Sequence, residues 1–214
     1  MVEGDAMAAG VVADLPRRFG GPGRFGLVAG LALVVAEAAV GVLAPAVART
    51  VFVGVAAGLW SVVAAVVAGR FAPSPRVAAV TAAGLQAGVV ILVALARAVP
   101  EFLLVFVPQA LVAVTAATAA ARSRAGRRAD PLWAGLAVGL PGGIVVVLWQ
   151  LGHTGRGVLA AGLVLVAVTA VVLSRRAAHL PVVVPFGVAV ALASAPVYSL
   201  VPAAFAALFP VAAG

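Results

Sequence analysis

The chain of 214 residues contains no cysteine, no lysine and no asparagine, and only 9% of its residues are charged. Without cysteine it can form no disulfide, iron–sulfur cluster or thiol nucleophile. Without lysine it can form no Schiff base with retinal, so seven helices would not make it a rhodopsin. A soluble domain carries about 25% charged residues, so this chain has too little polar surface to cover a water-soluble globule.

Apolar residues are in excess: they make up 65% of the chain, and the mean hydropathy is +1.25. Soluble domains are about 45–50% apolar. The net charge of +8 comes entirely from arginine, which in a soluble protein would suggest nucleic-acid binding. Here the arginines stand between apolar runs and no aromatic residues are interleaved with them. Membrane topology explains the charge better, and no nucleic-acid partner is expected.

Seven apolar runs each approach the ~20 residues that an α-helix needs to cross ~30 Å of hydrocarbon. They are continuously apolar, whereas strands of a membrane barrel alternate polar and apolar residues. The pattern predicts an all-α, seven-helix transmembrane bundle over residues 25–202, preceded by a polar tail at 1–24 and followed by an apolar tail at 203–214. The predicted spans lie near 25–45, 50–69, 77–96, 101–121, 132–151, 157–174 and 182–202.

The arginines alternate between the two sides of the predicted bundle. With the N-terminus inside, eleven arginines fall in inner segments and three in outer segments, as the positive-inside rule requires. The densest inner loop is a topology determinant that faces anionic lipid headgroups, and it contains Arg122, Arg124, Arg127 and Arg128. The sequence therefore predicts a multi-pass protein of a prokaryotic cytoplasmic membrane, with the N-terminus inside and the C-terminus outside.

The two ends of the bundle leave alternatives open. Prolines interrupt the seventh span, which predicts a kinked helix with an interfacial tail; a re-entrant end is the alternative. The stretch Ala46-Val47-Ala48 resembles a signal-cleavage site. The length of the first span and the acidic residue within it argue against cleavage.

That acidic residue is Glu37, which lies in an otherwise apolar span. A carboxylate at such depth is expensive and is a functional candidate by default. Helical spacing places it on one face with Gly26, Gly30 and Gly41, and small residues mark the close approach of another helix. No arginine lies within any predicted span, so desolvation favours the neutral acid.

Gln86 and Gln109 lie at a similar predicted depth, counting 1.5 Å per residue from the span ends. One interpretation is a proton- or cation-linked site in which Glu37 titrates and the two amides are co-ligands. The other is a structural hydrogen bond donated by the neutral acid between helices. The structural interpretation is favoured, because transporters usually carry more than one intramembrane charge.

Pro141, Gly142 and Gly143 form a candidate helix break in the fifth span. Discontinuous helices of this kind build substrate sites in secondary transporters, whereas a simple kink is the favoured alternative because glycine and proline are common in membrane helices. No internal repeat is found. Glycines spaced four apart predict either dimerisation or close packing within the chain; these pairs are Gly26/Gly30, Gly54/Gly58, Gly84/Gly88 and Gly135/Gly139.

Three classes of function remain. We expect a non-enzymatic membrane subunit or scaffold that packs against other membrane subunits or forms a homo-oligomer in the lipid bilayer. The alternative is a small transporter or permease that uses Glu37, and the third is an intramembrane enzyme. Catalytic templates are missing, since no span places a histidine beside a serine or pairs aspartates to hold Mg²⁺. No cofactor and no metal are expected.

Overall fold

A computed structural model describes residues 18–43, 59–97, 102–123, 130–150, 156–173 and 179–208. Within those ranges the chain forms seven helices and no strand, which confirms the all-α prediction. The helices are α2 (Pro22–Leu43), α4 (Leu59–Phe71), α5 (Pro75–Arg97), α6 (Phe102–Arg122), α7 (Asp130–Gln150), α8 (Arg156–Leu173) and α9 (Leu180–Leu208). Six of them begin within three residues of a predicted span. The exception is the span at 50–69, whose first nine residues lie outside the described ranges.

Local residue chemistry sets where two of the helices begin. Gly20 has φ 74°, a conformation that favours glycine, and Pro22 then opens α2 with a φ already suited to a helix. At α5 the side chain of Ser74 caps the first turn by accepting a hydrogen bond from the Val77 backbone N–H at 3.3 Å. Pro75 follows at the first helical position, where its missing N–H is not needed.

Two of the seven helices, α7 and α9, are long and apolar enough over their described residues to cross a membrane. In α7 61% of the candidate window is buried inside the bundle, but in α9 the share is only 22%. Over the residues whose side chains are described, α2, α4, α5 and α8 provide shorter apolar stretches. The seven-span count therefore remains a prediction, while the seven helices are observed.

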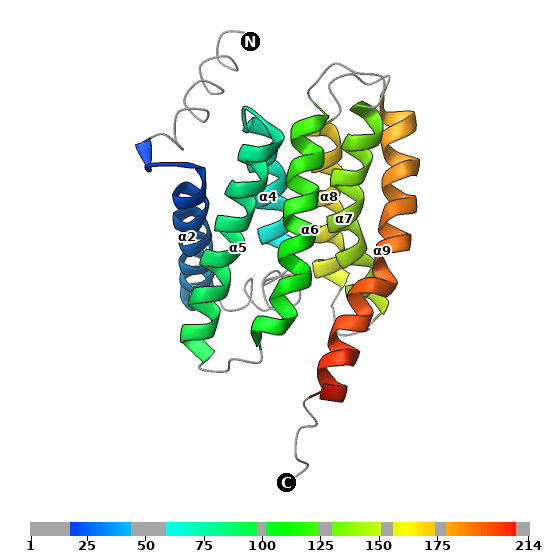
Figure 1. Cartoon of the computed structure of the whole chain (residues 1–214). Coiled ribbons are helices and arrows are strands. Elements are labelled where there is room, and N and C mark those ends of the chain that lie inside the picture. The colour runs from blue at the N-terminus through cyan, green and yellow to red at the C-terminus, as the bar shows by residue number, and fades with distance from the viewer. Residues whose placement is uncertain are drawn as a thin grey trace.

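The bundle is broad rather than round, with α2 and α9 at opposite edges and α6 between them (Figure 1). The two most extensive pairings are α2 with α5 and α7 with α9. Neither pair is sequential, and both are parallel, because contacting positions rise together along the two helices. In the middle of the bundle α6 contacts α4, α5 and α7.

Glycines make the contact between α2 and α5 possible. A Cβ on Gly26 would overlap the carbonyl oxygen of Thr81, and one on Gly30 would overlap that of Leu85. From the other side, a Cβ on Gly84 or Gly88 would meet the backbone of α2 in the same way. These two glycine pairs therefore pack against each other within the chain. Of the two alternatives, dimerisation and internal packing, these pairs serve internal packing.

A second glycine seam joins α7 to α9. Gly135, Gly139 and Gly143 follow one another at intervals of four and lie against the backbone and side chains of α9. A Cβ on Gly139 would overlap the carbonyl oxygen of Gly187, and one on Gly143 would overlap the Ser194 hydroxyl. Gly135 and Gly139, for which the sequence left dimerisation and internal packing open, thus form a contact inside the bundle.

The candidate break at Pro141, Gly142 and Gly143 does not interrupt the helix, because α7 is continuous from Asp130 to Gln150. The discontinuous-helix alternative is therefore not observed. The glycines around the proline are used for close approach to α9 instead. A proline removes one backbone donor and displaces the carbonyl four residues earlier, which can bend a helix without ending it.

The seventh helix also continues through its prolines. It reaches Leu208, six residues beyond the predicted end at 202, and residues 209–214 lie outside the described ranges. Figure 1 shows α9 changing direction toward its C-terminal end, in keeping with the predicted kink. A large part of the tail predicted at 203–214 is therefore helical.

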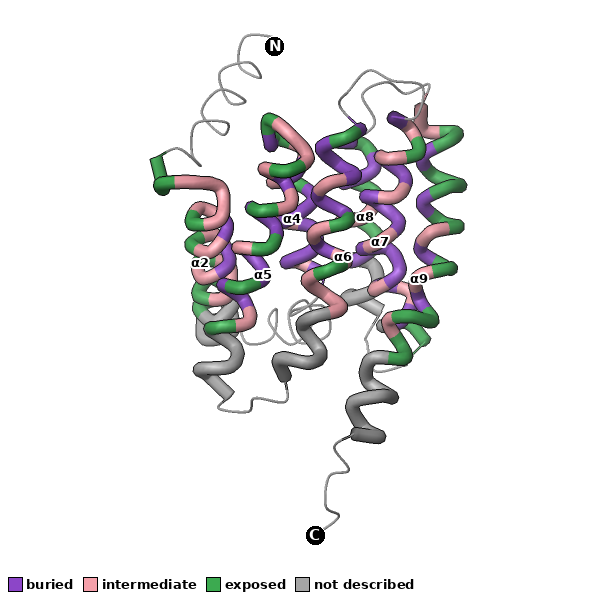
Figure 2. Tube along the Cα trace, in the orientation of Figure 1, coloured by how far each residue is buried: buried purple, intermediate pink, exposed green. Residues whose placement is uncertain are grey.

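The core consists of small residues. Its largest cluster is dominated by alanine and valine from α4 to α7, and the buried positions run through the centre of the bundle (Figure 2). Gly69 of α4 lies against the backbone of Ala117 in α6, so these helix backbones also approach closely. Close packing of small residues is how helices associate where lipid removes the hydrophobic driving force.

Candidate functional site

The described part of the chain contains one cluster of polar side chains that joins three helices. The Nε2 atom of Gln109 in α6 donates a hydrogen bond to the Ser61 hydroxyl in α4 at 2.8 Å. It also lies 3.3 Å from Oε1 of Gln86 in α5, to which it donates. Ser61 and Gln86 are each only 1% exposed, so the cluster lies in the interior of the bundle.

Within this cluster Gln86 has an unmet donor. Its Nε2 atom is buried and has no hydrogen-bond partner among the residues that the structure describes. Reversing the Gln86 amide alone would place its Nε2 against the donor Nε2 of Gln109, so the two amides are oriented together. A buried polar atom without a partner costs roughly 1–3 kcal/mol of stability, so within the cluster the Gln86 amide is the costly group to bury.

The structure brings together two of the three residues of the predicted polar site, Gln86 and Gln109. The third, Glu37, lies in α2, but its side chain is outside what the structure describes. It follows Gly30 by seven residues, or about 10 Å along the axis, and Gly30 itself lies beside Leu85. The grouping of Glu37 with the two amides therefore stays a prediction.

Ser61 is the member of the cluster that the sequence did not single out. It is the only side-chain hydroxyl inside the apolar run from 51 to 69. Counting residues from the ends of each span, as for Gln86 and Gln109, would have identified it as a polar residue deep in its span. A lone serine in a membrane helix usually bonds to its own backbone, so its role became visible only when α6 was placed beside α4.

The surroundings of Pro141 contain polar groups that stabilise helix packing. The Tyr198 hydroxyl of α9 donates to the Leu140 carbonyl oxygen of α7 at 3.0 Å. The Ser194 hydroxyl donates to the Ala191 carbonyl oxygen within α9 at 3.2 Å. These bonds join or line the α7–α9 seam.

Of the four arginines in the basic loop, only Arg122 lies within the described residues. The guanidinium carbon of Arg122, in the last turn of α6, lies 4.7 Å from the ring centre of Trp133 near the start of α7. This cation–π contact ties the end of one helix to the beginning of the next. The other three predicted residues, Arg124, Arg127 and Arg128, lie outside the described ranges.

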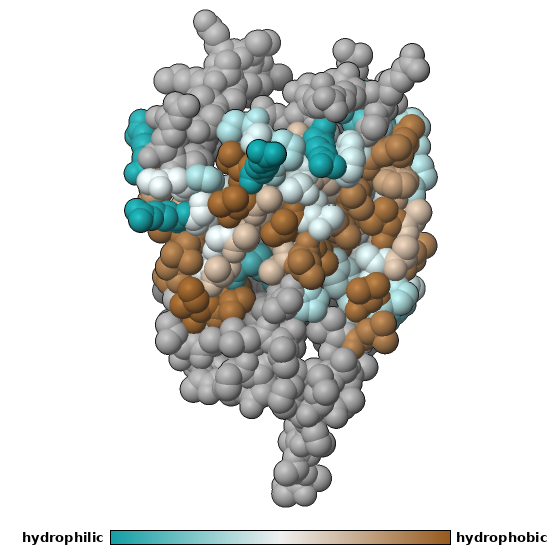
Figure 3. Space-filling view, in the orientation of Figure 1, coloured by the Kyte–Doolittle hydropathy of each residue, from teal (hydrophilic) through white to brown (hydrophobic). Residues whose placement is uncertain are grey.

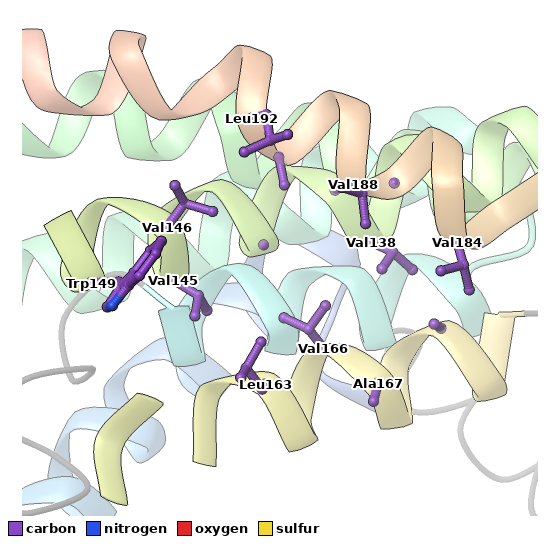
Figure 4. A pocket seen from close by; sticks show the side chains of 15 residues that line it. Val138, Val145, Val146, Trp149, Leu163, Val166, Ala167, Val184, Val188 and Leu192 are labelled. Atoms are coloured by element: carbon purple, nitrogen blue, oxygen red, sulfur yellow. The ribbon is translucent and has the colours of Figure 1, made fainter. Parts of the chain in front are cut away.

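A groove lies between α7, α8 and α9, with a volume of about 580 Å³. Its lining residues are valine, leucine, alanine, glycine and one tryptophan, and the lining offers almost no polar atom. Figure 4 shows Val188 and Leu192 of α9 on one side and Leu163 and Ala167 of α8 on the other, with α7 between them. The groove and the polar cluster are thus built from different helices.

The hydrophilic residues seen on one face of the molecule gather toward the end where α6 finishes and α7 begins, and hydrophobic side chains cover the middle (Figure 3). No group of three His, Asp or Glu side chains that could hold a metal occurs among the described residues. The chain matches no protein-family model, no curated protein and no solved structure. Function is therefore inferred from the geometry of the chain itself.

Proposed function

We propose that the chain is a seven-span integral membrane protein of the cytoplasmic membrane that acts as a non-enzymatic subunit or scaffold. The observation that carries the membrane placement is α9, a helix of 29 residues whose 21-residue apolar window is only 22% buried. The core helix of a soluble protein can be equally apolar, but it is mostly covered. An apolar helix this exposed fits lipid better than water.

The outer surface of α8 supports the same placement. Large apolar side chains on its outward face, including Leu163, Val164 and Val171, are each more than three-fifths exposed. Together with the exposed valines and leucines of α9, they give this side of the bundle an apolar surface that extends over two helices. Contiguous apolar surface of that kind marks contact with a membrane or with another protein.

The distribution of charge supports an N-inside orientation. Five described arginines belong to one end of the bundle, where α2 and α5 begin and α4 and α6 end, and two belong to the other end. The five are Arg18, Arg24, Arg70, Arg76 and Arg122, and the two are Arg97 and Arg156. Trp149 lies at the other end, near the end of α7, with 67% of its surface exposed. Arginines on the cytoplasmic side and tryptophans at the interface are typical of membrane helices.

The buried polar groups favour a scaffold over an enzyme. The hydroxyls of Ser123 and Thr169 donate to backbone carbonyls of their own helices, at 2.7 Å each. The Tyr198 hydroxyl connects α9 to α7, and the amide cluster connects α4, α5 and α6. The Ser123 and Thr169 bonds are local, whereas the Tyr198 bond and the amide cluster join different helices. Among the described residues, none of these groups stands beside a nucleophile or an acid–base pair.

A photocrosslinking experiment tests the subunit proposal. A photoreactive residue at Val197, exposed on α9, is expected to form a stoichiometric crosslink to one protein in native membranes. The matched control is Val35, equally exposed but on α2 at the opposite edge. If neither position yields a protein adduct while the chain remains in the membrane fraction as a monomer, the subunit proposal is refuted and the membrane placement is kept.

A transporter with a proton- or cation-linked site at Glu37 is the second candidate. The observation that favours it is the buried, unpartnered Nε2 of Gln86 beside Gln109, since polar residues inside a membrane bundle often mark an ion pathway. The test is dye-reported proton uptake into proteoliposomes under an imposed membrane potential. Equal uptake by wild type and Glu37→Gln between about pH 5 and pH 8 would end this candidate.

A further inference from the structure

We propose that the groove between α7, α8 and α9 is a binding site for one phospholipid acyl chain from the outer leaflet. This inference rests on the membrane placement proposed above. The groove exists because α7 contacts both neighbours, whereas α8 and α9 scarcely touch each other. The two outer helices therefore stand apart and leave about 580 Å³ open along the side of α7.

The chemistry of the lining restricts the occupant to hydrocarbon. Val188 and Leu192 face Leu163 and Ala167 across the groove (Figure 4). A buried water needs about two to four polar partners, and the lining provides almost none. A polar or charged ligand would lose its hydration without compensation. An apolar chain loses nothing of that kind.

The length of the groove distinguishes an acyl chain from a helix. Its lining positions on α7 run from Val138 to Trp149, which is about 16 Å at 1.5 Å per residue. That is roughly half of the ~30 Å hydrocarbon thickness that a transmembrane helix must cross.

Trp149 identifies the leaflet. It lines the groove at the end of α7 that is opposite the end with the larger number of arginines, and it is 67% exposed. Tryptophan is enriched at the level of the lipid headgroups, so the groove begins at the outer interface and runs toward the middle of the membrane. A phospholipid whose headgroup lies near the indole can place one tail along Val145 and Gly142.

Small residues line the groove. Gly139, Gly142 and Gly187 lie at its floor, where α7 and α9 pack closely together. Ala167 contributes only a methyl group to the α8 wall. The acyl chain therefore contacts the helices on several sides, whereas a chain on the flat exterior contacts them on one. Because lipid and protein are equally apolar, the preference comes from this larger number of van der Waals contacts.

The test is the number of phospholipids that survive mild-detergent purification from vesicles of phosphatidylglycerol and phosphatidylethanolamine, counted by native mass spectrometry. Wild type is expected to retain one. Ala167→Phe fills the groove from α8 and Val188→Phe fills it from α9, so each should retain none. The matched controls are Val168→Phe and Val197→Phe, which are exposed on the same two helices and do not line the groove.

Three results would overturn the acyl-chain proposal. One is retention of the phospholipid by both groove-filling variants, and another is its equal loss from the controls. The third is a second copy of the chain or another protein that remains bound to wild type and is lost from the groove-filling variants. Folding of every variant is checked by its far-UV spectrum and elution volume. If the chain leaves the membrane fraction at alkaline pH without detergent, the membrane placement fails instead.

Discussion

Replacing Gln109 with leucine tests whether the amide cluster stabilises the bundle. Leucine has nearly the volume of glutamine, so the change removes hydrogen bonds without opening a large cavity. It deletes the donor to Ser61 and the donor to Gln86. Gln86 is 1% exposed and its Nε2 already lacks a partner, so the variant would leave that amide buried without its bond to Gln109.

The size of the effect follows from bonds of this kind. Interhelical side-chain hydrogen bonds in membrane bundles contribute roughly 0.6 kcal/mol on average and about 1.7 kcal/mol at most. Loss of two of them, with a buried carbonyl oxygen of Gln86 left over, predicts that Gln109→Leu lowers the free energy of unfolding by about 1–2 kcal/mol. Thr115→Val is the control on the same helix, because Thr115 donates to the Leu111 carbonyl at an exposed position.

The assay is equilibrium unfolding in mixed micelles with increasing dodecyl sulfate, followed by tryptophan fluorescence. A double variant, Gln86→Leu with Gln109→Leu, replaces both amides by apolar groups and should recover most of the loss, since removing both partners leaves no orphaned amide. If Gln109→Leu behaves like the Thr115 control, or if the two changes are additive, the amides do not stabilise the bundle as a unit.

Three other perturbations have clear expected outcomes. Gly30→Leu forces a side chain into the backbone of α5 and should lower the free energy of unfolding by about 3 kcal/mol. Ala32→Leu, at an exposed site of the same helix, should have little effect. Equal effects of the two changes in the unfolding assay would contradict the close packing of α2 on α5. Tyr198→Phe removes one bond to a carbonyl of α7 and should lower stability by only about 0.6 kcal/mol, so a loss several times larger would mean that the hydroxyl has another role. Because the chain has no cysteine, single cysteines introduced by Pro73→Cys and Gln150→Cys can be labelled in intact cells with an impermeant maleimide. Only the cysteine at 150, on the proposed outer side, should react. The reverse result would invert the proposed orientation.

The positions of the helices were predictable because the information is local. Continuous apolar runs, separated by arginine, proline and glycine, marked most helices to within a few residues. The glycine face of the first helix was also predictable, since Gly26 and Gly30 do meet another helix. The partner of that face was not, because a four-residue glycine spacing specifies a surface of one helix and contains no information about which other helix lies against it.

The discontinuous helix considered as one alternative at Pro141 is not observed, for a related reason. Proline and neighbouring glycines weaken a helix in isolation, and the sequence alone gives only that local cost. In the bundle, α9 lies against Gly139 and Gly143, and a partner packed along the helix stabilises the helical path. Local propensity thus lost to tertiary packing, as it commonly does.

The same reasoning explains why Ser61 was missed and why it matters. Leu59 and Val63 are four residues apart, on one face of α4, and they pack against Val145 of α7. Ser61 lies two residues from each, about 200° around the helix, on the opposite face that meets Gln109. A helix buried on both faces is apolar all round and has no amphipathic pattern to orient it, so no periodicity could assign Ser61 a direction. Its position gives α4 two roles at once: one face anchors the amide cluster, and the other supports a residue that lines the groove.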